Sequence, residues 1–210
     1  MSHEALVAAC ALLALLLAPV LNLLADRVAG DVHRRLPGRR LALEATVVAA
    51  FGAAALRIGW SATLPITLAL FAGLAPLVAS DLEHHLLPRR ILYPAGAVAA
   101  IALLAAAAGT GEWRRLVVAA LCGVGAFAMT WVVHAANPRW LGFGDVRLSG
   151  LIGVTLGWQG VSRVWLGLVV ADLAGLAVMG ALIASGRARR DTAFPFGAFL
   201  AAGAVVAALV

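Results

Sequence analysis

The sequence predicts an all-α polytopic membrane protein, a bundle of about eight transmembrane helices forming a single domain over residues 1–210. Three observations lead to this fold class. Hydrophobic residues make up 63% of the 210 residues and charged residues only 12%. Long apolar stretches recur along the whole chain, with polar connections between them. All 16 basic residues are arginine, and in short loops such residues indicate membrane topology rather than nucleic-acid binding.

Eight apolar segments are expected to cross the membrane. They cover residues 5–25, 41–58, 62–80, 91–108, 116–135, 146–158, 161–185 and 194–210. The sixth, with about 13 residues, is shorter than the roughly 20 that span a bilayer as a straight helix. The arginines favour a crossing nevertheless. With eight crossings, 12 of the 16 lie on one side, and only four lie on the other: Arg57, Arg114, Arg115 and Arg163.

The arginine-rich side is expected to be the cytoplasm, and both termini are then expected outside. Arginines follow the first segment and none precedes it, so this segment is predicted to be a retained anchor rather than a signal peptide. The same topology places Asp81, after the third segment, and Asp145, before the sixth, at the cytoplasmic face. A carboxylate at the edge of the hydrocarbon is costly, so each is a candidate functional residue.

Two short motifs carry these carboxylates, Ser80-Asp81 and Gly142-Phe143-Gly144-Asp145. Glycines let the backbone turn and let another segment approach closely. Two adjacent carboxylates can catalyse hydrolysis, one as a base on water and the other as a proton donor to the substrate carbonyl. Such a pair is expected to share one proton. The alternative is that each aspartate only caps a helix, which leaves the flanking glycines unexplained.

Gly142-Phe143-Gly144-Asp145 resembles the GxGD signature of membrane aspartic proteases, and residues 81–94 resemble the other aspartate block of the prepilin peptidases, or type IV leader peptidases. Residues 145–159, 194–200 and 19–27 resemble further blocks of that family in the same order. The resemblance implies an aspartic endopeptidase with Asp81 and Asp145 as the catalytic pair. The supporting positions would be Gly142, Gly144, Glu83, Pro195 and Gly197.

The resemblance also implies the substrate and the location. The substrate would be a type IV prepilin-like precursor with a short basic leader before a hydrophobic helix. The enzyme would lie in the bacterial inner membrane, in contact with lipid and with pilus or secretion assembly machinery, and would cut at the cytoplasmic face. The connection 26–40 holds none of the cysteines of the family's cytoplasmic insert, so N-methylation of the product is not expected.

Other polar residues have weaker interpretations. Glu83 is either a supporting acid or a solvated loop charge. Adjacent His84 and His85 lack the spacing of metal ligands, so no metal and no cofactor are expected. Asp172, in the middle of the seventh segment, is expected to be protonated and hydrogen-bonded to a neighbouring helix. The rival class of protein is a small transporter or proton-coupled carrier that uses buried acids without peptidase activity.

Overall fold

The computed structural model describes residues 2–29, 38–84, 87–138, 141–187 and 195–210. These residues form eight α-helices, which confirms the predicted fold class. The helices are α1 (His3–Ala29), α2 (Arg39–Ile58), α3 (Thr63–His84), α4 (Arg89–Thr110), α5 (Trp113–Ala136), α6 (Phe143–Gly157), α7 (Val161–Ala184) and α8 (Phe196–Leu209). Six of them are long and apolar enough to cross a membrane, and the exceptions are α6 and α8, with 15 and 14 residues.

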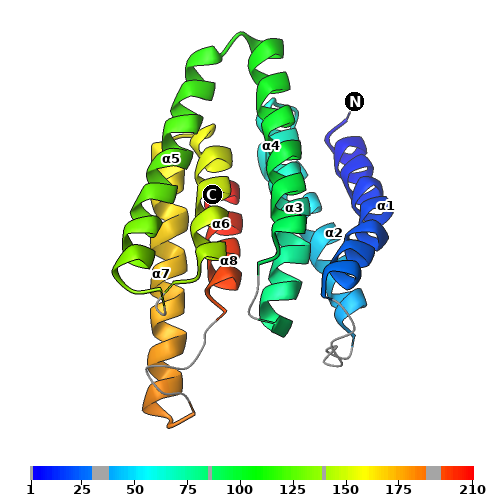
Figure 1. The fold of residues 1–210 in the computed structure, drawn as a ribbon. Helices are drawn as coiled ribbons and strands as arrows, with labels where there is room; N and C mark the ends of the chain where they lie inside the picture. The colour runs from blue at the N-terminus through cyan, green and yellow to red at the C-terminus, as the bar shows by residue number, and fades with distance from the viewer. Residues whose placement is uncertain (1, 30–37, 85–86, 139–140, 188–194) are drawn as a thin grey trace.

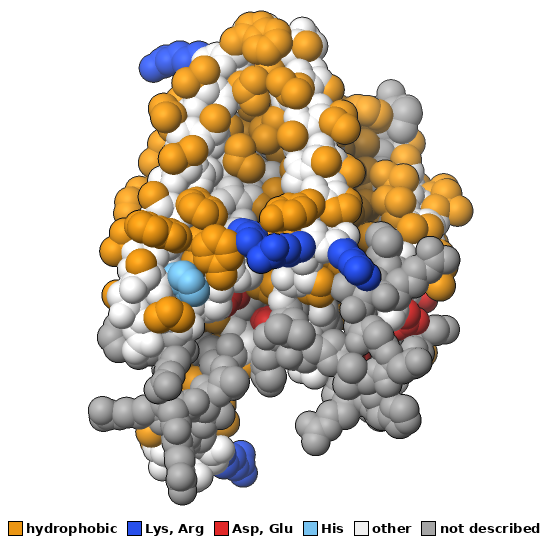
Figure 2. Space-filling model, viewed as in Figure 1, with side chains coloured by type: hydrophobic (Ala, Val, Ile, Leu, Met, Phe, Trp, Pro, Cys, Tyr) orange, Lys and Arg blue, Asp and Glu red, His pale blue; other side chains and the backbone are white. Residues whose placement is uncertain are grey.

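The two short helices occupy the interior of the bundle. In Figure 1, α6 and α8 lie between α5 and α7 on one side and α3 and α4 on the other. Two thirds of the residues of α6 and half of those of α8 are buried, whereas the long helices α5 and α7 bury only a narrow stripe. Figure 2 shows hydrophobic side chains covering most of the visible flank of the molecule. In a bilayer, the central helices of a bundle are expected to be apolar on all sides, and the surrounding helices are expected to present apolar faces to the lipid.

Several helices extend further than the predicted apolar segments, and two of these extensions matter for the aspartates. The third was expected to end at Ser80, but α3 continues to His84 and includes Asp81. The sixth was expected to begin at Val146, but α6 begins at Phe143 and includes Asp145 in its first turn. Both aspartates therefore lie on helix ends rather than in connections. Hydropathy marks where a segment leaves the hydrocarbon, and a helix can continue beyond that point.

Glycines let α6 approach α5 at backbone distance. A Cβ added to Gly153 would lie 2.8 Å from the Cys122 carbonyl oxygen and 2.8 Å from the Ala126 Cβ. A Cβ added to Gly157 would lie 2.9 Å from the Ala119 Cα. Helices in lipid gain little from hydrophobic burial, so close van der Waals contact between small residues supplies much of their association energy. This contact positions α6 and, through it, Asp145.

We expect Gly153→Ala to lower the free energy of unfolding by about 1–3 kcal/mol, because the backbone of α5 must move to admit one methyl group. Gly125→Ala is the matched control. No atom lies within 4 Å of a Cβ at Gly125, and alanine is the better helix former. Thermal unfolding in detergent measures both changes. Equal stability of the two variants would show that the close α5–α6 contact at Gly153 does not contribute to the free energy of unfolding.

Candidate active site

Asp81 lies near the end of α3 and is almost completely enclosed, with 4% of its surface exposed. Its Oδ2 accepts a hydrogen bond from the backbone N–H of Ala198, at 3.1 Å. Ala198 belongs to the first turn of α8, where backbone N–H groups have no partner inside the helix. The positive end of the α8 dipole therefore stabilises a negative charge on Asp81.

Asp145 occupies the third position of α6 and is 8% exposed. Its Oδ2 accepts the N–H of Gly142 at 3.2 Å and so caps the start of its own helix. Its Oδ1 is buried and, within the part of the chain that the structure describes, has no hydrogen-bond partner. Capping explains one oxygen of this carboxyl group and leaves the other available inside the protein.

Leu87, in the connection between α3 and α4, packs against the starts of both short helices. A Cβ added to Gly144 would lie 2.8 Å from the Leu87 Cβ, and one added to Gly197 would lie 3.1 Å from the Leu87 Cδ1. The same added atom on Gly197 would lie 2.9 Å from the Asp81 Oδ2. Both glycines are therefore required for close approach. The sequence motifs identified the glycines but not the leucine that they accommodate.

The structure brings Asp81 and Asp145 into electrostatic contact. Burial raises the pKa of Asp145, and the negative charge of Asp81 raises it as well, while the N–H of Gly142 acts in the opposite direction. The resulting pKa of Asp145 is about 7, compared with an ordinary value of 3.8. Asp145 lies on α6, which is not one of the six helices long enough to span a membrane. A like charge raises a pKa only at short range. Asp145 therefore retains its proton in mildly acidic conditions while α8 stabilises a charge on Asp81.

Two residues that were not among the candidate site residues, His134 and Arg147, contact the first turn of α6 and the residue before it. The Nδ1–H of His134, near the end of α5, donates to the Leu141 carbonyl oxygen at 2.8 Å. The rings of His134 and Phe143 have centroids 5.3 Å apart. The guanidinium carbon of Arg147 lies 4.3 Å from the centre of the Phe143 ring, a cation–π contact. Phe143, the variable position of the GxGD motif, thus anchors the turn that carries Asp145.

An apolar groove of about 750 Å³ begins near Asp81, at Glu83 and Ala198, and runs between α2, α3 and α8. Its walls include small residues, among them Ala75 and Ala79 of α3 and Ala202 of α8. Ala198, whose N–H binds Asp81, lines the same groove. Glu83 also lines it and is half-buried at the end of α3. This glutamate is thus part of a helix at the wall of the groove, and it is not a loop charge.

The remaining residues singled out in the sequence have other environments. Pro195 immediately precedes α8 and fixes where that helix begins. His85 lies outside the described residues, and among those described no group of three or more His, Cys, Asp or Glu side chains forms a potential metal site. Asp172 lies on the exposed side of α7. No hydrogen bond joins it to any part of the chain that the structure describes, so the expected bond to a neighbouring helix of this chain is not found.

These features define an integral membrane protein with a buried pair of carboxylates at one end of its helical bundle. Comparison with family models gives the family. The model of the type IV leader peptidase family matches residues 68–209, and the chain belongs to this family. The matched region contains both aspartates, Leu87 and all of α8.

Curated relatives agree with this assignment. The chain is 34% identical over 94 residues to a prepilin leader peptidase/N-methyltransferase of Burkholderia pseudomallei (strain 1026b), covering 43% of this chain and 29% of the relative. It is 38% identical over 93 residues to a protein of the same name from Pectobacterium carotovorum subsp. carotovorum, covering 42% of this chain and 32% of the relative. The match thus spans about a third of each relative. No solved structure matches the chain significantly.

The raised pKa predicts how stability depends on pH. The folded protein holds the Asp145 proton up to about pH 7, whereas the unfolded chain releases it near 3.8. Wild-type stability therefore contains a contribution that is complete below pH 3.8 and is lost as the pH rises to 7. Asp145→Asn lacks this contribution, so the variant gains stability relative to wild type across that window, on the order of 4 kcal/mol at most.

Thermal unfolding between pH 4 and pH 8 measures this difference. Glu4→Gln, which replaces an exposed carboxylate at the start of α1, is the control and should follow wild type. Parallel curves for Asp145→Asn and wild type would mean that Asp145 is already ionised in the folded protein at low pH.

Proposed function

We propose that this chain is a membrane aspartic endopeptidase that removes the short basic leader of type IV prepilin-like precursors. The observation that carries the proposal is the meeting of Asp81 and Asp145, far apart in sequence, inside a region that matches the type IV leader peptidase family. The relatives named prepilin leader peptidase/N-methyltransferase support the substrate class.

The proposed mechanism assigns different roles to the two carboxylates. Asp81, whose charge is stabilised by the N–H of Ala198, takes a proton from water as the oxygen attacks the peptide carbonyl carbon. Asp145, whose pKa is near 7, gives its proton to the carbonyl oxygen. When the tetrahedral intermediate collapses, the C–N bond breaks, the leaving amine takes the proton from Asp81, and a hydroxyl proton of the intermediate returns to Asp145.

The groove between α2, α3 and α8 suits the hydrophobic helix that follows the leader of such precursors. Small residues along it, including Ala75, Ala79 and Ala202, would let a substrate helix pack closely. The groove ends at Glu83 and Ala198, beside Asp81, so a helix lying in it would direct its N-terminal end to the carboxylates. The acidic end of the groove complements a basic leader.

We further propose that the site faces the cytoplasm from the bacterial inner membrane and that the chain does not methylate the product. The arginine distribution supports the orientation. The connection between the first two helices contains no cysteine, unlike the insert associated with methylation in the resembling family. Partners would be the precursors themselves and the machinery that assembles them.

The decisive test of the proposed function is cleavage. Purified wild-type protein, Asp81→Asn and Asp145→Asn are each mixed with a precursor that carries a basic leader and a hydrophobic helix. We expect wild type to cut behind the leader and each variant to lose roughly 10²–10⁴-fold in rate, the usual contribution of general acid–base catalysis. Mass spectrometry of the new N-terminus identifies the cleaved bond and shows whether a methyl group was added.

Variants that cut as fast as wild type would remove the aspartates from the mechanism. Failure of the wild-type protein to cut any such precursor would favour the rival class, a transporter or proton-coupled carrier. The thermal unfolding measured for Asp145→Asn shows whether that variant is folded, and the same assay applies to Asp81→Asn.

The groove can be tested separately from the chemistry. Ala79→Leu should fill part of it and raise the KM for a full precursor roughly tenfold while kcat stays near wild type, because the lost interaction is with the bound helix. Ala120→Leu, on the exposed face of α5, adds the same atoms away from the groove and is the control. An unchanged KM for Ala79→Leu would show that the substrate helix lies elsewhere.

A further inference from the structure

The end of the bundle opposite the aspartates contains a second, basic cavity of about 680 Å³. The ends of α2, α3, α5, α6, α7 and α8 surround it. Trp158, which lines it, follows Asp145 by 13 residues along α6 and its end, which is about 20 Å of helix. The cavity is therefore separate from the candidate active site. Its volume lies in the range of roughly 300–1,000 Å³ that is usual for small-molecule sites.

Four arginines line this cavity: Arg57, Arg114, Arg115 and Arg163. They come from three separate parts of the chain, the end of α2 and the starts of α5 and α7. They are also the four arginines that the topology places on the side where arginine is disfavoured. An arginine on the disfavoured side of the membrane in a single loop needs no special cause. The gathering of all four around one cavity is a tertiary feature that topology does not account for.

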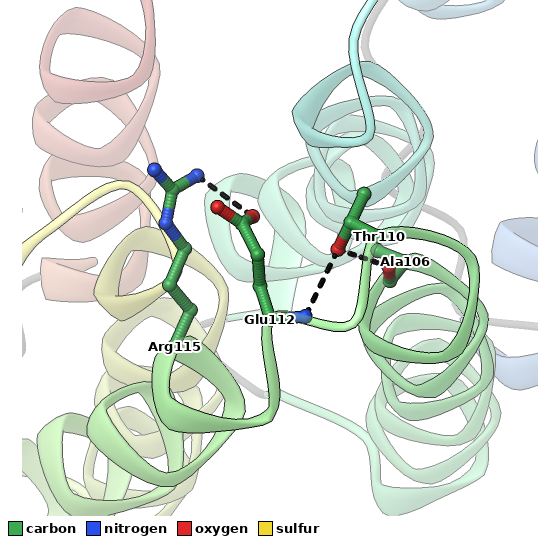
Figure 3. A network of polar contacts seen from close by, with 4 residues as sticks. All are labelled: Ala106, Thr110, Glu112 and Arg115. Atoms are coloured by element: carbon green, nitrogen blue, oxygen red, sulfur yellow. Dashed lines mark hydrogen bonds and ion pairs between the residues drawn. The ribbon is translucent and has the colours of Figure 1, made fainter.

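The described side chains around the cavity carry four positive charges and one negative charge. Figure 3 shows the single acid, Glu112, with its Oε2 3.1 Å from the Arg115 Nη1. Arg163 donates through Nη1 to the Ala207 carbonyl oxygen of α8 at 3.2 Å, which fixes its position and leaves its charge unneutralised. In the described ranges, neither Arg57 nor Arg114 has an ion pair or a side-chain hydrogen bond.

Neutral hydrogen-bonding groups complete the lining. Ser61 and Thr63, at the start of α3, contribute hydroxyl groups, and Gln159, beyond the end of α6, contributes an amide. The Gln159 Nε2 lies 3.4 Å from the Thr67 Oγ1, which holds this side chain against α3. Guanidinium forks together with hydroxyl and amide groups match the oxygens of a phosphate, which accept several hydrogen bonds at once.

We propose that this cavity binds a phosphate group, with Arg57, Arg114 and Arg163 as its principal ligands. The bound phosphate neutralises the excess positive charge and engages the three guanidinium groups that, among the described residues, have no acidic partner. The phosphate belongs to an anionic lipid headgroup or to a soluble phosphate, because either presents the same oxygens. The site lies on the face opposite the proposed peptidase centre and does not depend on the proposed function.

Native mass spectrometry of the full chain in a zwitterionic detergent tests the site. Phosphatidylglycerol, phosphatidylcholine and inorganic phosphate are titrated in turn. Selective retention of one phosphatidylglycerol, weakened by inorganic phosphate or by added sodium chloride, identifies a lipid headgroup site. Saturable binding of inorganic phosphate without preference for either lipid identifies a soluble phosphate site. Either result supports the proposal. Phosphatidylcholine also contains a phosphate, but its choline cation compensates that charge, so both results require a site that selects a phosphate group with an uncompensated negative charge.

Arg57→Gln and Arg114→Gln should each weaken the observed binding about tenfold, because each removes charge-assisted hydrogen bonds. Arg187→Gln is the matched control, since Arg187 is exposed beyond the end of α7 and does not line the cavity. Equal binding by all three variants overturns the proposal. So does wild-type protein that fails to prefer phosphatidylglycerol over phosphatidylcholine and does not bind inorganic phosphate. The wild-type result decides the matter even if a variant does not fold.

Discussion

The site depends on one kind of interaction. At the starts of the two short helices, backbone N–H groups donate hydrogen bonds to two buried carboxylates. A charge in a low-dielectric interior requires compensation. Asp81 obtains it from α8 through Ala198, and Asp145 obtains a weaker form from its own helix at Gly142. The difference separates the two groups chemically, because Asp145 retains one unpartnered oxygen, within the described structure, and a pKa of about 7.

The short length of α6 and α8 makes this arrangement possible. Their 15 and 14 residues correspond to about 21–23 Å, compared with about 36 Å for the 24 residues of α5 and α7. Both helices can therefore begin inside the bundle, beside longer helices that exclude lipid. Backbone N–H groups that would be costly in hydrocarbon are instead available to carboxylates. Glycines at 144, 153 and 197 give the close approach that this interior packing needs.

The two ends of the molecule carry different kinds of site. At one end the buried aspartates lie near an apolar groove, and at the other end four arginines line a polar cavity. Between them lies a core of aliphatic residues contributed by nearly every helix. Asp172 belongs to neither end. It lies on the exposed side of α7, where the cost of a carboxyl group in hydrocarbon is not met by any described residue of this chain.

The sequence by itself determined the all-helical class and the order of the eight helices, and it selected the two aspartates as candidate functional residues. Hydropathy, the arginine distribution and the GxGD motif can all be read along the chain without knowledge of helix packing. The sequence also selected Gly144 and Gly197. Only the tertiary structure decided what those glycines contact, because Leu87 is an ordinary apolar residue until α6 and α8 pack against it. The support of Asp81 by Ala198 spans 117 positions, and the arginine cavity joins three distant segments. Contacts between residues so far apart depend on helix packing, which no local pattern records.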